Sequence, residues 1–422
     1  MRIENVSFSS GSWAFFLKKA AYGALFFVIA TAAFSNSLFQ ISSVIFIVLS
    51  LLSVIGTRQA SFLKNRWAIL VAVYFLMNLI SLAQSAYLFT SLKSIFAVLR
   101  QILLCLSVIY TVDSKDKFKA LFQFFCVVAF MIALDALIQG MVGYDLIRGR
   151  KMTPYFLERA GRLTGPFHHA NDFSAYLSFV IFLFLGLLPE GLKLLPAKRY
   201  WILVAGFLAV LAALAGTYSR GAWTAVGVTT VLFILYKRNV WLIAGLLLVL
   251  AWAGFFSPEL IRARVWSITD IRHNSTFEER KELWKESLRM IRKSPYFGSG
   301  VNTYAKNEPL YKSEPPFDKT KGPMVDNQYA HNGYLQIAAE IGCLGLLSFL
   351  VVMGYSLASA FYSFTRAGDL WVKTAGVALV FGIFSFLIHS AVETNLQSVL
   401  LVNTLWLAVG MMWAANRLTQ EA

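Results

Sequence analysis

The chain has 422 residues, of which 58% are hydrophobic and 14% are charged, and its mean hydropathy is +0.62. Soluble domains usually carry about 25% charged residues, so the composition excludes an ordinary soluble protein and predicts a membrane protein. The 38 Lys and Arg residues outnumber the 22 Asp and Glu residues, which gives a formal net charge of +16. This excess of cations favours anionic partners, either lipid headgroups or a phosphorylated substrate.

Twelve segments are apolar enough to be candidates for membrane-spanning helices, which need about 20 such residues. The first follows Lys18 and Lys19 and lacks a clear cleavage site, which favours a retained helix over a signal peptide. The cysteines, Cys105, Cys126 and Cys343, lie in apolar runs and are predicted to be buried rather than disulfide partners or ligands. The predicted spans are 20–36, 39–56, 67–88, 94–112, 120–142, 173–189, 200–217, 220–236, 239–256, 342–364, 373–391 and 396–415.

The distribution of cations orients these spans. If the N-terminus is cytoplasmic, 17 Lys and Arg residues fall in cytoplasmic segments, whereas the outer loops at 37–38, 217–219 and 392–395 contain none. Cytoplasmic loops carry such an excess, so both termini are predicted to be cytoplasmic. We therefore expect an all-α polytopic membrane protein with transmembrane helices 1–9 in residues 1–256, an outer loop domain at 257–329, and helices 10–12 in residues 330–422.

Two outer segments break this distribution of charge. Residues 143–172 hold five cations and residues 257–329 hold 13. A loop longer than about 60 residues is translocated largely regardless of its charge, so the predicted topology stands. The outer cations belong either to a soluble cap with a solvated basic face or to a binding site for a polyanionic group.

The outer loop contains a predicted amphipathic helix at about 276–293, which ends before Pro295. Arg280 follows Phe277 by three residues and precedes Trp284 by four, so it projects from within the apolar arc of this helix. An arginine in that position either extends along the surface to the membrane interface or points into a cavity of the protein.

Two further residues suggest chemistry at the outer face. The short turn at 216–221 places Arg220 at the start of a helix, as an interfacial anchor or as a bidentate phosphate ligand. His331 lies where the long loop returns to the membrane and is either structural or able to accept a proton near pH 7. His168, His169 and His389 also lie near this face, so spacing alone does not choose among them, and His273 is the weakest candidate.

Three blocks of sequence resemble a known family. His331-Asn332, nine residues, Gly342, two residues and Gly345 resemble the signature of O-antigen ligases, whose superfamily includes O-antigen polymerases and O-linked oligosaccharyltransferases. The segment 217–221 resembles the family's Ser-Arg-Gly block. Arg280 with the segment 293–298 resembles its outer-loop arginine helix and following turn. The stretch from Arg162 to Asn171 is also similar, and the resemblance runs from about residue 160 to 345.

The resemblance implies a GT-C-like fold with about 12 spans and a large periplasmic loop. It implies a glycosyltransferase of the bacterial inner membrane whose donor is a glycan on undecaprenyl pyrophosphate and whose acceptor is a sugar hydroxyl of lipid A-core. No metal and no cofactor are expected, and the sequence contains no Asp-x-Asp motif. No nucleic-acid partner is expected.

The resemblance also assigns roles to residues. Arg220 and Arg280 are expected to hold the diphosphate and stabilise its developing charge, and His331 is expected to take or orient the proton of the acceptor hydroxyl. A single displacement predicts inversion at the anomeric carbon. The residues expected to bind substrate around them are Arg162, Asn171, His168, His169 and Asn332.

Two other functions remain open. A polymerase uses the same lipid-linked donor and can share the arginines and the histidine block. A transporter or flippase for anions or lipid-linked glycan would need charged residues at mid-bilayer depth, and Arg100 and Asp135 are the candidates for such a pair. Protein glycosylation is less expected, because the chain stops seven residues after Ala415.

Overall fold

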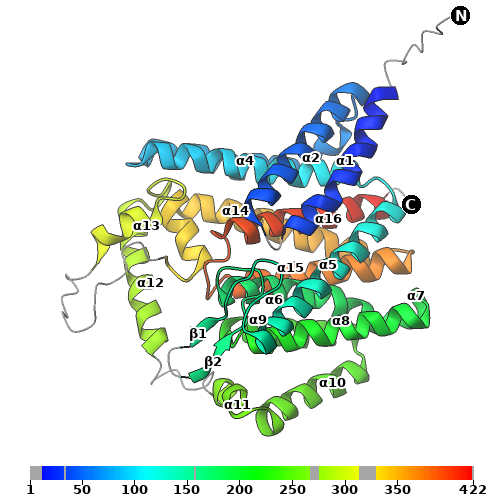
Figure 1. Ribbon diagram of the computed structural model, residues 1–422. Helices are drawn as coiled ribbons and strands as arrows, with labels where there is room; N and C mark the ends of the chain where they lie inside the picture. The colour runs from blue at the N-terminus through cyan, green and yellow to red at the C-terminus, as the bar shows by residue number, and fades with distance from the viewer. Residues whose placement is uncertain (1–11, 33–34, 156–157, 267–274, 313–328, 421–422) are drawn as a thin grey trace, which may run out of the picture.

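A computed structural model describes residues 12–32, 35–155, 158–266, 275–312 and 329–420 (Figure 1). Ten helices of this part of the chain are long and apolar enough to cross a membrane, which confirms the expected all-α polytopic membrane protein. They are α1 (Ser12–Thr31), α2 (Asn36–Thr57), α3 (Arg66–Ser81), α4 (Leu88–Thr111), α5 (Lys115–Val142), α6 (Ala170–Leu187), α8 (Ala197–Gly216), α14 (Gly333–Arg366), α15 (Leu370–His389) and α16 (Val399–Gln420).

Two of the twelve predicted spans fall below the length or hydropathy criterion for a candidate membrane span. The segment 220–236 forms α9 (Arg220–Lys237), whose charged ends and interior threonines lower its hydropathy. The segment 239–256 forms only twelve residues of α-helix, α10 (Val240–Ala251), before a π-helical turn. Ten helices of the described residues therefore qualify as candidate spans by length and composition, while α9 still reaches the other end of the bundle, where its Lys237 lies 4.0 Å from Glu190.

The interior of the bundle is built around α6, α15 and α16, whose residues are mostly buried. Helices do not gain by burying apolar surface against each other in lipid, so close van der Waals packing has to hold them together. Small residues provide it between α6 and α15, where a methyl group added to Gly186 would lie 2.4 Å from Cβ of Ala378. Helices α1 to α3 lie outside this centre and expose many apolar side chains.

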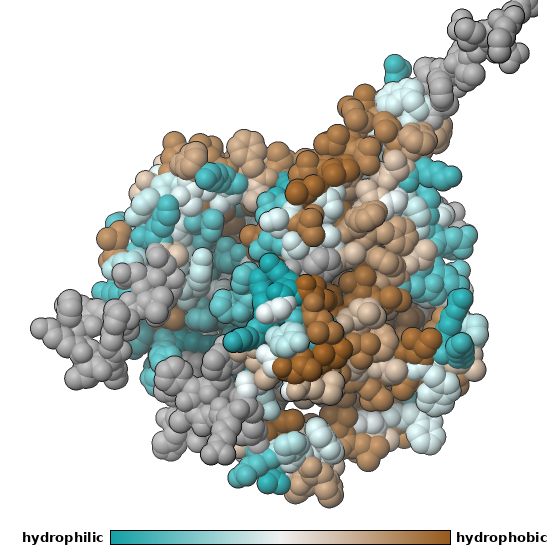
Figure 2. Space-filling view, in the orientation of Figure 1, coloured by the Kyte–Doolittle hydropathy of each residue, from teal (hydrophilic) through white to brown (hydrophobic). Residues whose placement is uncertain are grey.

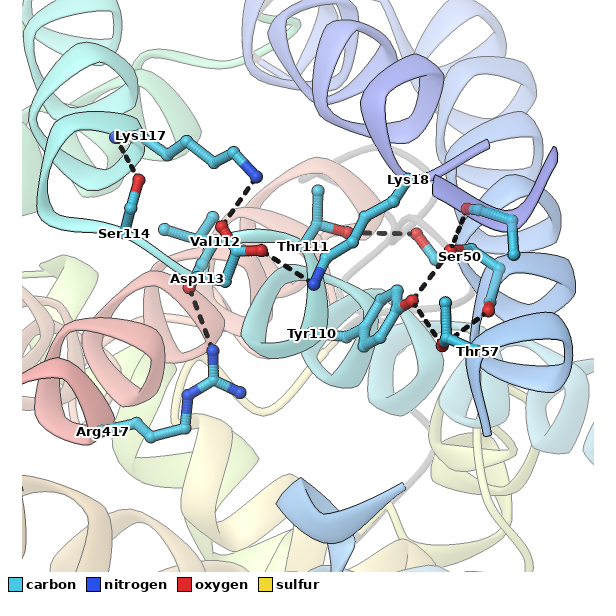
Figure 3. A network of polar contacts seen from close by, with 12 residues as sticks. Lys18, Ser50, Thr57, Tyr110, Thr111, Val112, Asp113, Ser114, Lys117 and Arg417 are labelled. Carbon is cyan, nitrogen blue, oxygen red and sulfur yellow. Dashed lines mark hydrogen bonds and ion pairs between the residues drawn. The ribbon is translucent and has the colours of Figure 1, made fainter. Parts of the chain in front are cut away.

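One end of the bundle is closed by a polar network that joins α1, α2, α4, α5 and α16 (Figure 3). Asp113, which follows α4, forms ion pairs with Lys18 of α1 at 2.8 Å and Lys117 of α5 at 2.7 Å. Arg417 of α16 donates to the carbonyl oxygen of Val112. The segments predicted to be cytoplasmic around residues 18, 115 and 417 therefore lie together at one end.

The opposite end carries the outer segments. The predicted helix at 276–293 is confirmed as α12 (Ser275–Lys293), and the segment around it contains α11 (Glu259–Trp266), α13 (Tyr304–Asn307) and the 3-10 helix η5 (Glu308–Tyr311). In residues 143–172 a short antiparallel hairpin, β1 (Thr153–Tyr155) with β2 (Glu158–Arg162), is a small departure from an all-helical fold. In Figure 2 hydrophobic residues cover the middle of the molecule, and hydrophilic residues gather near α12 and α13 at one end and near α7 (Gly191–Leu194) at the other.

The cysteines are unpaired. Cys105 and Cys126 are buried, as predicted. The prediction is wrong for Cys343, which is exposed because it lies on the outward side of α14. An apolar run in a membrane helix can face lipid instead of protein, so sequence alone does not distinguish the two environments.

Candidate active site

A buried carboxylate joins the predicted functional residues. Glu393 lies in the loop between α15 and α16, and its side chain is only 7% exposed. Its Oε2 accepts hydrogen bonds from Arg280 Nη2 at 2.9 Å and from Asn171 Nδ2 at 2.8 Å. Its Oε1 accepts a short hydrogen bond from His331 Nδ1. Side chains from three distant parts of the chain therefore converge on one carboxylate.

The partners of Glu393 keep it ionised. Burial alone would raise its pKa, but the hydrogen bond from His331 and the positive charge of Arg280 outweigh burial and hold the pKa below its usual range. A buried charge is tolerated only when it is paired and hydrogen-bonded, and here all three partners are donors. The cluster is thus a negatively charged centre held between a histidine and an arginine.

The backbone around His331 fixes the direction of its ring. His331 has a left-handed φ of +45°, which turns the chain just before α14. Asn332 then caps that helix, since its Oδ1 accepts from the backbone N–H groups of Tyr334 and Leu335. The N–H of Gly333 donates to the carbonyl oxygens of Ser390 and Glu393. These bonds fasten the start of α14 to the loop that carries the carboxylate.

The hydrogen bond to Glu393 also sets the chemistry of the imidazole. A carboxylate can only accept, so Nδ1 of His331 carries the hydrogen. In the neutral ring Nε2 is then an acceptor, and it hydrogen-bonds no other described residue. The side chain is 40% exposed. This arrangement presents a basic nitrogen to the outside of the cluster while the carboxylate supports it from behind, as in other carboxylate–histidine pairs.

Arg162 and Asn171 form a second row behind the carboxylate. Arg162, at the end of β2, donates from Nη2 to Asn171 Oδ1 at 2.7 Å and from Nε to the carbonyl oxygen of Thr217 at 2.7 Å. Asn171 in turn donates a hydrogen bond to Glu393. The hairpin, the first turn of α6 and the turn before α9 are therefore linked to the centre by side-chain hydrogen bonds.

Arg220 is brought to the same loop by the packing of α9. It is the first residue of that helix, and Gly221 follows it. A methyl group added to Gly221 would lie 2.8 Å from Val392 and 3.3 Å from the ring of His389. The glycine thus lets the start of α9 approach the residues directly before Glu393. The tight turn predicted at 216–221 has a left-handed residue, Tyr218.

Arg280 points into the protein from α12, which answers the question its position raised. Its Nη2 reaches Glu393, and its side chain is 23% exposed. The neighbouring Phe277 side chain lies outside the described residues. On the same side of the helix, Leu283 and Met290 are buried. The arginine therefore projects from an apolar face toward a carboxylate, and not along the surface.

A break in α14 receives the turn after α12. Gly342 has a φ of +77° inside the helix, and a methyl group there would lie 2.1 Å from the carbonyl oxygen of Tyr296. Gly298 lies equally close to the backbone of Glu340. The break frees backbone groups, so the N–H of Cys343 donates to Pro295 and the N–H groups of Ser299 and Gly300 donate to α14 carbonyls.

The side chain of Glu340 strengthens this junction. Its oxygens accept from the backbone N–H groups of Asn302 and Tyr304 and from the side chains of Gln336 and Gln397. A buried carboxylate with four donors fixes the loop after α12 against α14. These bonds hold α12, which carries Arg280, against α14, which begins two residues after His331.

The remaining predicted residues lie elsewhere or have other partners. His168 Nε2 lies 2.8 Å from Arg150 Nη2, and burial together with the charges of Arg150 and Arg148 lowers its pKa. His169 is exposed at the cap of α6 and reaches Glu393 through no described hydrogen bond. His389 is buried, and its Nδ1 lies 3.2 Å from Asn395 Nδ2. His273 lies outside the described residues.

The proposed mid-bilayer ion pair does not form. Arg100 donates from Nη1 to Gln40 Oε1 at 3.1 Å, and Asp135 accepts from the backbone N–H of Leu146 at 2.7 Å. No ion pair of the described residues joins the two. The expectation of a charge pair for transport is wrong for this structure.

Glu393 was not anticipated from the sequence. The absence of cations in the loop 392–395 indicates only that this loop lies on the outer side. One signal was present: Glu393 is one of only 22 acidic residues, and it stands at the outer end of a predicted span. A carboxylate near a membrane is costly and usually has a partner, so it could have been matched with the unexplained arginines.

The chemistry available at this cluster is that of acid, base and anion binding. It presents a half-exposed imidazole, a buried carboxylate, Arg280 bonded to that carboxylate, and Arg162 linked to it through Asn171. Among the residues that the structure describes, no group of three His, Cys, Asp or Glu side chains has the geometry to hold a metal ion.

A comparison with protein families agrees with the motifs. Residues 205–350 match a family model described as O-antigen ligase. This segment includes Arg220, Arg280 and His331, whereas Arg162, Asn171 and Glu393 lie outside it. No curated protein matches the chain.

Proposed function

We propose that this chain, whose residues 205–350 match the O-antigen ligase family model, transfers a glycan from undecaprenyl pyrophosphate to a sugar hydroxyl of lipid A-core. The reaction takes place at the periplasmic face of the bacterial inner membrane, inverts the anomeric carbon and requires no metal. Residues 257–329 form the periplasmic domain of this enzyme, between transmembrane regions at 1–256 and 330–422.

The observation that carries the proposal is the carboxylate shared by His331 and Arg280. Glu393 holds the histidine as a base, with Nε2 outward, and holds the arginine beside it. An acceptor hydroxyl and an anionic leaving group need these two groups within one site. Arg280 gives a single described hydrogen bond to Glu393, so further N–H groups of its guanidinium are left for an anion.

The reaction that fits is a single displacement. The acceptor oxygen forms a bond to the anomeric carbon while the bond from that carbon to the pyrophosphate oxygen breaks. The acceptor proton passes to Nε2 of His331, and the imidazolium is stabilised by Glu393. Negative charge grows on the departing undecaprenyl pyrophosphate, where Arg280 and Arg220 stabilise it. Holding both lipids in one site supplies proximity.

The outer residues divide into two groups under this proposal. Arg162 and Asn171, which we expected to bind substrate, are positioning residues, because their described hydrogen bonds lead to Thr217 and Glu393. Asn332 positions His331 by capping α14. His168 and His169 remain candidates for contacts with the glycan, since both are exposed.

The test is transfer by the purified protein in detergent with lipid-linked glycan and lipid A-core. We expect glycan on the core, and Arg280→Ala should lower the rate by at least about a hundredfold. Arg292→Ala is the matched control, because Arg292 lies exposed on the same helix. If the lipid-linked chains lengthen and the core stays bare, the protein is a polymerase and the ligase proposal is wrong.

A further inference from the structure

A groove runs between α2 and α4 on the lipid-facing side of the bundle. It encloses about 550 Å³ and has an apolar wall that includes Val44, Val48, Phe96 and Leu103. Three of these side chains are strongly exposed: Val44 by 48%, Val48 by 47% and Phe96 by 69%. In a membrane their exposed surface faces hydrocarbon, so the groove opens sideways to lipid chains.

The groove contains cations that no carboxylate balances. Lys93 and Arg100 of α4 both line it. Arg100 donates to the neutral side chain of Gln40, and its buried Nε has no hydrogen-bond partner. No ion pair among the described residues includes Lys93 or Arg100. Lys93 Nζ lies 4.3 Å from the centre of the Phe89 ring, which does not neutralise its charge. A charged group in a membrane protein is costly unless something pairs with it, so an anion from outside the chain would complete this site.

Although Arg100 lies midway along α4, its guanidinium contacts the outer end of α2, and Lys93 lies near the start of α4. Gln40, the partner of Arg100, is one turn from the outer end of α2. Val399, the first residue of α16, and Asn302 of the outer loop also line the groove. From Gln40 inward, the wall continues with Val44, Ile47 and Val48. The groove is therefore cationic at the interface and apolar below it, which matches a lipid with a phosphorylated headgroup.

The groove continues toward the active site. A smaller pocket of about 120 Å³ shares Ser94, Ala97, Asn302 and Val399 with it and extends to Leu396 and Gln397. Leu396 lies against Gly333, since a methyl group added there would be 3.1 Å from the leucine. Gly333 in turn is bonded to the Glu393 loop. The two pockets thus lead from the groove toward the start of α14, next to His331.

We propose that the groove between α2 and α4 binds the acceptor, a phosphorylated glycolipid, with its phosphate on Lys93 and Arg100 and its acyl chains along α2. This rests on the proposed transfer reaction. Figure 1 places α2 and α4 at one edge of the bundle and α9, which carries Arg220, well away from them beside α8. A single displacement needs the attacking hydroxyl opposite the leaving group, so the acceptor approaches from the side away from the donor's diphosphate.

The first test measures acceptor binding without transfer. The full chain in nanodiscs, with a photoreactive amino acid at Val44, is irradiated with lipid A-core and no donor. We expect capture, with a loss of roughly tenfold or more in Lys93→Gln/Arg100→Gln, because charge-assisted hydrogen bonds are removed, and a similar loss with enzymatically dephosphorylated lipid. The same photoreactive group at Leu52, exposed on α2 outside the groove, is the control for bulk lipid. Equal capture at Leu52, or capture indifferent to phosphate, would overturn the proposal.

A kinetic test separates the groove from the reaction. Val48→Trp fills the groove, and we expect the KM for lipid A-core to rise roughly tenfold while the donor KM stays unchanged; Leu52→Trp should leave both unchanged. A rise in the donor KM alone means that the groove holds the donor and the inference is wrong. Capture at Val44 by a protein that transfers nothing to the core counts against the proposed function and leaves the groove standing.

Discussion

At the residue scale, the site depends on one carboxylate with three partners. Glu393 is joined to His331 across 62 positions of the sequence and to Arg280 across 113. If one partner of a buried, hydrogen-bonded charge is removed, the remaining buried charge is left uncompensated. His331, the proposed base, and Arg280, the proposed anion-binding residue, are therefore positioned by the same carboxylate.

Replacing that carboxylate by an amide tests the support directly. Glu393→Gln keeps the shape but removes the charge that stabilises an imidazolium at His331, and we expect kcat for glycan transfer to fall about 10–100-fold, the usual effect of losing a supporting carboxylate. Donor binding, measured separately, should weaken less. The control is Glu190→Gln, at the opposite end of the bundle beside Lys193. Near-normal turnover by Glu393→Gln would remove Glu393 from the mechanism.

Much of this site was predictable because its residues carry local signals. Arg280 stands out within an apolar arc, and Arg220 and His331 lie where apolar runs begin. The hydrogen bond that Arg162 donates to Asn171 agrees with the resemblance noted for the stretch between them. Glu393 has no such local pattern, because its role depends on partners that are distant in the sequence. A loop of four residues without cations gives no sign of which helices fold over it.

At the element scale, the position of Gly342 in the motif that begins at His331 has a structural cause. Gly342 breaks α14, and the turn after α12 packs into the break through Gly298. Sequence showed the spacing but not the reason, because an interrupted helix has the same apolar composition as a continuous one. The expected number of spans was larger because α9 and α10 lie in apolar stretches. The charged ends of α9 and the short length of α10 keep both below the length and hydropathy criterion for a candidate span.

The break can be tested with one methyl group. Gly342→Ala forces a side chain into a left-handed conformation and against the Tyr296 carbonyl, which costs of order 1–3 kcal/mol in the folded state. We expect a lower melting temperature in detergent and a large loss of transfer, because α12 and Arg280 shift. Gly354→Ala, on the same helix with open space around its Cα, should behave as wild type. If Gly342→Ala also behaves as wild type, the junction between α14 and the turn after α12 does not position Arg280.

At the scale of the whole molecule, two ends differ in chemistry. The end closed by Asp113, Lys18 and Lys117 gathers the loops that the charge distribution predicts to be cytoplasmic. The other end gathers Glu393, α12 and the hairpin. Since loops joining successive spans alternate between these ends, the orientation of any one exposed residue fixes the side on which the active site lies.

That orientation is measurable with an impermeant thiol reagent on intact cells. In a Cys343→Ala background, Arg292→Cys on α12 should be labelled at once, whereas Lys64→Cys, between α2 and α3, should react only after the inner membrane is permeabilised. Both original side chains are exposed, so access to the reagent depends on the side of the membrane. The reverse pattern would place Glu393 and His331 in the cytoplasm. Transfer at the periplasmic face would then be impossible, whatever the geometry of the cluster, because lipid-linked donor and acceptor would meet the protein on its wrong side.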